Sequence, residues 1–192
     1  MEMNEMPELI KGFLLSPTET FRKVREAGTG EALMYLAVLT VIFSVLAGIV
    51  AATGIGNVTG SEMGSVAGVG GGIVAIPFVF VAVLIGTIIG GVILHIFVYL
   101  VGGRQGIGQT IKAVIYAQTP NLLLGWIPFL GVITGIWTLV LEILGIRELQ
   151  KLTTGRAVLA VLLPVILAII LAFLASTTIS GMVYSQITQA GM

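Results

Sequence analysis

The stretch Ile73–Val101 reads IVAIPFVFVAVLIGTIIGGVILHIFVYLV and contains no Asp, Glu, Lys or Arg. A helix needs roughly 20 apolar residues to cross a bilayer core of about 30 Å, because each residue advances it by about 1.5 Å. This stretch is therefore long enough to span a membrane. It places the chain among helical membrane proteins, and the flanking sequence extends that interpretation.

Further apolar segments lie on both sides of this stretch. Leu33–Thr53 carries no charge, and Ala157–Thr178 is interrupted only by Pro164. Ile111–Ile146 is apolar but is broken at Gly125-Trp126-Ile127-Pro128. This break leaves two interpretations, either two short tilted spans or a re-entrant hairpin that returns to the side it left; we favour two spans.

The composition agrees with a chain dissolved mainly in lipid. Of its 192 residues, 57% are hydrophobic and 9% are charged, and the mean hydropathy is +1.11. Soluble domains carry about a quarter charged residues. The formal net charge is zero, so the chain offers no basic excess for binding nucleic acid.

The positions of lysine and arginine predict the orientation. Basic residues occur before the first span, between the second and third spans, and before the last span, at Lys11, Arg22, Lys23, Arg25, Arg104, Lys112, Arg147, Lys151 and Arg156. The connection 54–72, the turn 125–128 and the segment after Thr178 contain none. Since basic loops stay in the cytoplasm, the N-terminus is expected inside and the C-terminus outside.

These observations predict an all-α, polytopic bundle with a short cytoplasmic segment before it. The expected organisation is a cytoplasmic amphipathic segment 1–32, a transmembrane domain 33–178 and an external tail 179–192. The predicted spans are 33–53, 73–101, 111–125, 129–146 and 157–178. Residues 54–72 are rich in glycine and are expected to form a flexible external loop.

The N-terminal segment has apolar residues at helical spacing, among them Phe13 and Phe21, with Arg22, Lys23 and Arg25 beside them. Ser16-Pro17-Thr18-Glu19 predicts a helix start, with Ser16 as the N-cap and Glu19 closing a capping box. One interpretation is a helix that lies on an anionic membrane surface or docks a partner. The alternative is a helix that packs under the bundle.

Several polar residues are expected at one depth near the cytoplasmic ends of the spans. Ionisable residues inside a membrane are costly and often functional. The candidates for a polar pocket are His95, Lys112, Tyr116, Gln118, Asn121, Glu142 and Arg147. Pro120 also deprives the Tyr116 carbonyl of its usual helical partner. The alternative interpretation is polar contact between helices close to the membrane surface.

Small residues at four-residue spacing allow membrane helices to approach closely. The spacing occurs at Gly48 with Ala52, and in two pairs of glycines, Gly86 with Gly90 and Gly131 with Gly135. These faces can pack within one chain or join copies into a homo-oligomer. Other membrane proteins and the lipid bilayer are the remaining expected partners.

The motifs of several enzyme classes are missing. The chain has no aspartate and no cysteine, and its single histidine lies outside any H-E-x-x-H motif. Neither a G-x-S-x-G motif nor a nucleotide-binding Lys-Ser/Thr after the glycine-rich run is present. We therefore expect no enzymatic activity, metal or cofactor.

Three stretches resemble the Yip family of Ypt/Rab-interacting membrane proteins, in its prokaryotic branch. They are Leu15–Val24 with the pattern P-x-x-x-F-x-x-V, Gly106–Tyr116 leading to Thr119-Pro120, and Gly131 through Trp137 and Leu144-Gly145-Ile146 to Thr153-Thr154 and Ala157. The resemblance implies five membrane helices with a cytoplasmic N-terminus. Eukaryotic members bind prenylated Rab GTPases and one another, although their D-L-Y-G-P motif is absent here.

Two functions follow from these features. The first is a non-enzymatic membrane adaptor or organising protein of the Yip type, in the plasma membrane of a prokaryote. The second is a small-solute or ion transporter or channel that uses the cytoplasmic-side polar pocket. Discontinuous helices with polar residues inside the membrane are a pointer to transport sites.

Overall fold

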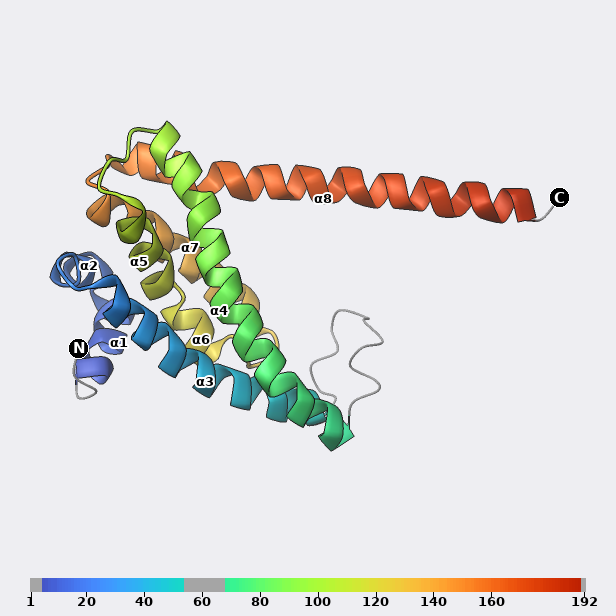
Figure 1. Ribbon diagram of the computed structural model, residues 1–192, viewed down its shortest axis with the longest axis horizontal. Helices are drawn as coiled ribbons and strands as arrows, with labels where there is room; N and C mark the ends of the chain where they lie inside the picture. Colours follow the sequence, from blue (N-terminus) through green and yellow to red (C-terminus); the bar gives the residue numbers. More distant parts are fainter. Residues whose placement is uncertain (1–4, 54–67, 191–192) are drawn as a thin grey trace.

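The computed structural model describes residues 5–53 and 68–190, and over these ranges the chain is helical, without strands. The helices, shown in Figure 1, are α1 (Met6–Leu15), α2 (Pro17–Lys23), α3 (Thr29–Thr53), α4 (Gly68–Leu100), α5 (Ile107–Ala117), α6 (Thr119–Leu124), α7 (Leu130–Leu149) and α8 (Thr154–Ala190). The all-α class expected from the sequence is confirmed.

Among the described residues, four helical segments are long and apolar enough to cross a membrane, within α3, α4, α7 and α8. The protein is thus an integral membrane protein. The expected span 111–125 is not one of these segments, because it is divided into α5 and α6 at Gln118. The break follows from Pro120, which has no N–H to donate to the Tyr116 carbonyl.

The helix ends differ from expectation at two places. Most of the predicted external loop 54–72 lies outside the described residues, but its last part, Gly68–Gly72, already belongs to α4. Helix α8 continues to Ala190, beyond the expected start of the tail at residue 179.

Helices α3 and α4 approach each other closely at Gly48 and Gly72, near the ends next to their connection (Figure 1). A Cβ atom on Gly72 would lie 2.6 Å from the Gly48 carbonyl oxygen and 2.7 Å from the Ala52 Cβ. Only hydrogen fits at such a contact, so the small residues allow the two backbones to touch.

The other two glycine pairs do not make such contacts within the chain. A Cβ atom on Gly86, Gly90 or Gly135 would meet no atom of the described residues within 4 Å. On Gly131 its nearest neighbour would be the Gly125 carbonyl oxygen at 3.5 Å. These glycines therefore leave open space on α4 and α7.

Helix α8 packs on α4 and α7 only along its first part and then extends away from the other helices (Figure 1). Ala157, Ala160 and Val161 are buried, whereas the large apolar side chains from Ile166 to Leu174 are exposed. Apolar side chains exposed on a membrane helix face lipid, so this surface suits a bilayer.

Helix α1 packs on α6 and α2 packs on α7, and Phe13 of α1 also contacts Tyr35 of α3. Ser16 is the N-cap residue and Pro17 the first residue of α2, as expected, but the Ser16 side chain makes no capping bond. Instead the Ser16 carbonyl accepts a hydrogen bond of 2.9 Å from the Thr20 hydroxyl. We call α1 and α2 together the cap.

Candidate functional site

Two phenylalanines attach the cap to the membrane helices. Phe13 and Phe21 are fully buried, and their rings meet edge to face with centroids 4.9 Å apart. Phe13 also stacks on Tyr116, with a centroid distance of 4.9 Å, and Tyr116 lies 5.2 Å from the Tyr35 ring. The sequence suggested that these two side chains lie on the membrane surface. In the structure they lie in the protein interior instead.

The Glu148 carboxylate at the end of α7 holds the cap by charge. Arg22 Nε donates to Glu148 Oε2 at 2.8 Å, and Arg147 Nη2 lies 2.9 Å from Oε1. Arg25 Nη2 donates to the Glu148 carbonyl at 2.6 Å. The hydrogen bond to Glu148, together with its negative charge, raises the pKa of Arg22 above its ordinary value. We call this group of three arginines around one glutamate the Glu148 clamp.

The Lys112 side chain anchors the segment that links the cap to α3. Its buried ammonium group donates to the carbonyl oxygens of Val24, Arg25 and Ala27 at 3.3, 2.6 and 2.8 Å. Three carbonyls match the three donors of a lysine. Lys112 is thus held by backbone oxygens, and no contact with Glu142 is present.

His95 belongs to a separate polar group at the ends of α4, α5 and α7. Its Nδ1 lies 2.8 Å from the Thr110 hydroxyl. Gln150 Nε2 donates to the same hydroxyl at 2.9 Å and to the Gly106 carbonyl at 2.8 Å. These bonds connect the turn before α5 to the end of α7.

The carbonyl of Tyr116, which Pro120 leaves without a helical partner, receives one from a side chain. The Thr119 hydroxyl donates to it at 2.6 Å. The same hydroxyl lies 2.9 Å from the Tyr35 hydroxyl on α3. Because the Thr119 hydrogen is used on the carbonyl, Tyr35 is the donor of this second bond. The polar groups of Tyr35, Tyr116 and Thr119 at the break between α5 and α6 are therefore paired and buried.

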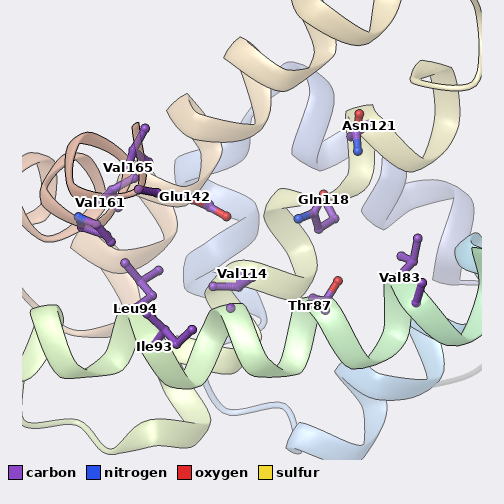
Figure 2. A pocket seen from close by; sticks show the side chains of 15 residues that line it. Val83, Thr87, Ile93, Leu94, Val114, Gln118, Asn121, Glu142, Val161 and Val165 are labelled. Carbon is purple, nitrogen blue, oxygen red and sulfur yellow. The ribbon is translucent and has the colours of Figure 1, made fainter. Parts of the chain in front are cut away.

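The remaining polar candidates line a groove of about 460 Å³ between α4 and α8, with α5, α6 and α7 behind it. Figure 2 shows Glu142, Gln118 and Thr87 pointing into this space, with Asn121 farther along. Its other lining residues are small or apolar, namely Ala82, Val83, Gly86, Gly90, Ile93, Leu94, Val114, Val161, Pro164, Val165 and Ala168. We call it the α4–α8 groove.

The polar residues predicted to share one pocket are thus divided among different places. Gln118, Asn121 and Glu142 line the groove, while Lys112, His95, Tyr116 and Arg147 have partners elsewhere in the chain. Within the described residues, no three acidic or histidine side chains are placed to hold a metal ion.

Two residues with long-range polar contacts were not singled out from the sequence: Glu148, which holds the cap, and Gln150, which holds the turn before α5. Glu148 lies 126 residues from Arg22 along the chain, and Gln150 lies 44 from Gly106. No local pattern connects partners so far apart. The signal in the sequence was the basic run Arg22–Arg25 before the first span together with the acidic Glu148 at the end of a later span.

The amino-acid sequence matches a known family over most of its length. The Yip1 domain matches residues 11–176, from the cap to the exposed part of α8. The chain belongs to the Yip1-domain family. No curated protein and no solved structure gives a significant match. The match covers both the Glu148 clamp and the α4–α8 groove, so both lie within the Yip1 domain.

Proposed function

We propose that this Yip1-domain protein is a non-enzymatic membrane adaptor that presents its cap to a partner protein in the cytoplasm. The observation that carries the proposal is the attachment of the cap. Phe13 and Phe21 are buried, and Arg22, Arg25 and Arg147 surround Glu148. A short N-terminal segment held this firmly gives a fixed surface, which lowers the entropy lost on binding.

A cleft of about 620 Å³ on the cap provides a place for such a partner. It lies between α1, α2 and the start of α3, and both signs of charge line it, including Glu8, Lys11 and Lys23. Mixed charges over a floor that includes Leu9 and Tyr116 suit a polypeptide, because complementary charges select the partner and apolar contacts add affinity.

The proposal includes the orientation and the number of crossings. We place the cap and the basic residues in the cytoplasm, the end of α8 outside, and the protein in the plasma membrane of a prokaryote. Helices α5 and α6 together cross once, since their 18 residues, 107–124, extend over about 27 Å. With α3, α4, α7 and α8 this makes five crossings within the domain 33–178.

Crosslinking in the native membrane tests the adaptor function. A photoreactive amino acid is placed at Lys11 or Lys23, both exposed on the cap, and at Leu171 or Phe173 on lipid-facing α8 as matched controls. We expect discrete protein adducts from the cap and only lipid adducts from α8. Glu148→Gln should weaken the cap adducts. If the cap positions gave the same pattern as α8, the adaptor proposal would be wrong.

A second candidate function is the transport of a small solute or ion, and the presence of Glu142 in the α4–α8 groove favours it. Weighing against it, His95, Lys112 and Arg147 are bound within the chain and do not continue the polar surface. Flux measurements in proteoliposomes decide between them. A solute or ion flux that is present in the wild type and abolished by Glu142→Gln would support the transporter function and argue against the adaptor function.

A further inference from the structure

The α4–α8 groove contains an acidic group without a partner. Within the described residues, the Glu142 carboxylate makes no hydrogen bond and no ion pair, whereas the Glu148 carboxylate, nearly two turns further along α7, pairs with three arginines. No described residue that lines the groove is positively charged. A carboxylate at this depth is costly for a membrane helix to hold, so a missing counter-charge is the notable feature of the site.

The other polar groups of the groove are neutral. Asn121 Oδ1 already accepts a bond of 3.3 Å from the Thr134 hydroxyl, and Gln118 has no side-chain partner among the described residues. Thr87 adds a hydroxyl on the facing helix. Such dipoles can orient a ligand, but they cannot neutralise a carboxylate.

The rest of the groove is apolar and has room. Gly86 and Gly90 face it without side chains, and a Cβ atom on either would meet nothing within 4 Å. Its volume of about 460 Å³ falls within the range of about 300–1,000 Å³ typical of small-ligand sites. Ile93, at its edge, is 48% exposed on the outer surface of α4, so the groove opens sideways toward lipid.

We propose that the α4–α8 groove binds a hydrophobic cation from the bilayer, an amphiphile whose ammonium head pairs with Glu142 and whose apolar part lies along the Gly86–Gly90 face of α4. The head supplies the positive charge that the lining lacks, and its N–H groups make charge-assisted hydrogen bonds to the carboxylate. An anionic amphiphile is repelled by Glu142. A neutral one leaves the charge unpaired.

Equilibrium dialysis of the full chain in phosphatidylcholine nanodiscs tests the proposal with decylammonium as the probe. Empty nanodiscs give the simple partition of the probe into lipid, which is subtracted. We expect saturable binding that a second hydrophobic cation displaces and that decyl sulfate and decanol do not. Binding equal to that of empty nanodiscs, or equal displacement by decyl sulfate, would overturn the proposal.

Three variants connect the binding to the groove. Glu142→Gln removes the charge at nearly constant shape and should weaken binding by about tenfold or more. Gly90→Leu keeps the carboxylate but fills the open space beside α4, and should have a similar effect. Glu26→Gln makes the same chemical change at an exposed position outside the groove and should leave binding unchanged. Wild-type affinity in both groove variants would contradict the assignment.

A second copy of the chain is the competing occupant. Ile93→Cys provides a single thiol at the edge of the groove, because the natural chain has no cysteine. We expect it to react with a maleimide carried by a long-chain ammonium and not to form a disulfide between copies. A disulfide-linked dimer that excludes decylammonium would overturn the proposal. Because these tests leave the cap untouched, their failure does not bear on the adaptor function.

Discussion

Phe21 of the cap lies directly against Gly145 of α7. A Cβ atom at Gly145 would come within 2.8 Å of two carbon atoms of the Phe21 ring and within 3.1 Å of the Ala113 Cβ. The absence of a side chain at Gly145 therefore leaves the space that the Phe21 ring occupies. It brings α2 close enough for Arg22 to reach Glu148, one turn further along α7.

Gly145→Ala should push the cap away from α7. Overpacking of this kind lowers the free energy of unfolding by about 1–3 kcal/mol. Denaturation with SDS in mixed micelles measures the change. Gly135→Ala is the matched control. It raises the helix propensity of α7 by the same amount, but its new methyl group meets nothing within 4 Å. Equal stability of the two variants would show that the cap does not depend on this contact.

Glu148→Gln should loosen the cap, since three guanidinium groups then lie together without a carboxylate. A single thiol at Thr20→Cys reports the opening, because Thr20 is buried between α1 and the rest of α2. We expect maleimide labelling to become several-fold faster. High salt should accelerate labelling of the wild-type background more than that of the variant, because it screens the ion pairs. Glu26→Gln serves as the control, and a rate as high as that of Glu148→Gln would argue against the clamp.

Lys112→Met should destabilise the connection between the cap and α3. Methionine removes all three bonds of the ammonium group. The Val24 and Arg25 carbonyls keep a second donor, the Ala27 N–H and the Gln109 amide, but the Ala27 carbonyl loses the only one given for it among the described residues. Bonds from a charged donor contribute about 1.5–3 kcal/mol, so we expect a loss of about 3 kcal/mol in SDS denaturation. Lys23→Met changes an exposed lysine of the cap in the same way and should alter stability by less than about 0.5 kcal/mol.

Thr119→Val should destabilise the protein at the break between α5 and α6, which lowers the free energy of unfolding. The isosteric side chain removes the donor to the Tyr116 carbonyl and the acceptor for Tyr35. Leaving two buried polar groups unpaired costs about 1–3 kcal/mol each. Thr177→Val on exposed α8 removes a hydroxyl that bonds only to its own helix, and is the control. If both variants lost the same free energy of unfolding, the Thr119 hydrogen bonds would not be what stabilises the break.

The number of crossings can be read from thiol accessibility. Ile127→Cys, in the turn after α6, should react with an impermeant reagent added outside the cell, and Lys151→Cys, after α7, only once the cytoplasm is opened. The reason is that α5 and α6 together are long enough to cross. Labelling of Ile127→Cys from neither side, or only from the cytoplasmic side, would favour the re-entrant hairpin.

Membrane-length helices could be predicted because the signal is local. Runs such as Leu33–Thr53 and Ile73–Val101 are apolar on every face, so length and composition alone indicate a span. Helix starts were also accessible, as at Ser16-Pro17, where proline favours the first turn. The end of the loop at Gly72 was placed too late, since residues 68–72 are helical and Gly72 packs on α3.

The candidate polar layer was predicted only in depth. Counting about 1.5 Å per residue places His95, Lys112 and Glu142 at a similar level, but it does not tell which way each side chain points. In a helix that is apolar all round, no polar face marks the direction of its neighbours. His95 turns to Thr110, Lys112 to the carbonyls before α3, and Glu142 to the groove.

The amino-acid sequence alone is sufficient to establish a helical membrane protein and its membrane-length segments, because hydrophobic length acts within each segment. It also provides Pro120, whose missing N–H breaks the helix. The partners of Glu148, the seat of Phe21 at Gly145 and the isolation of Glu142 depend on contacts between residues far apart in the chain. Such contacts follow from the direction and separation of whole helices, and these quantities are defined only once the helices pack together.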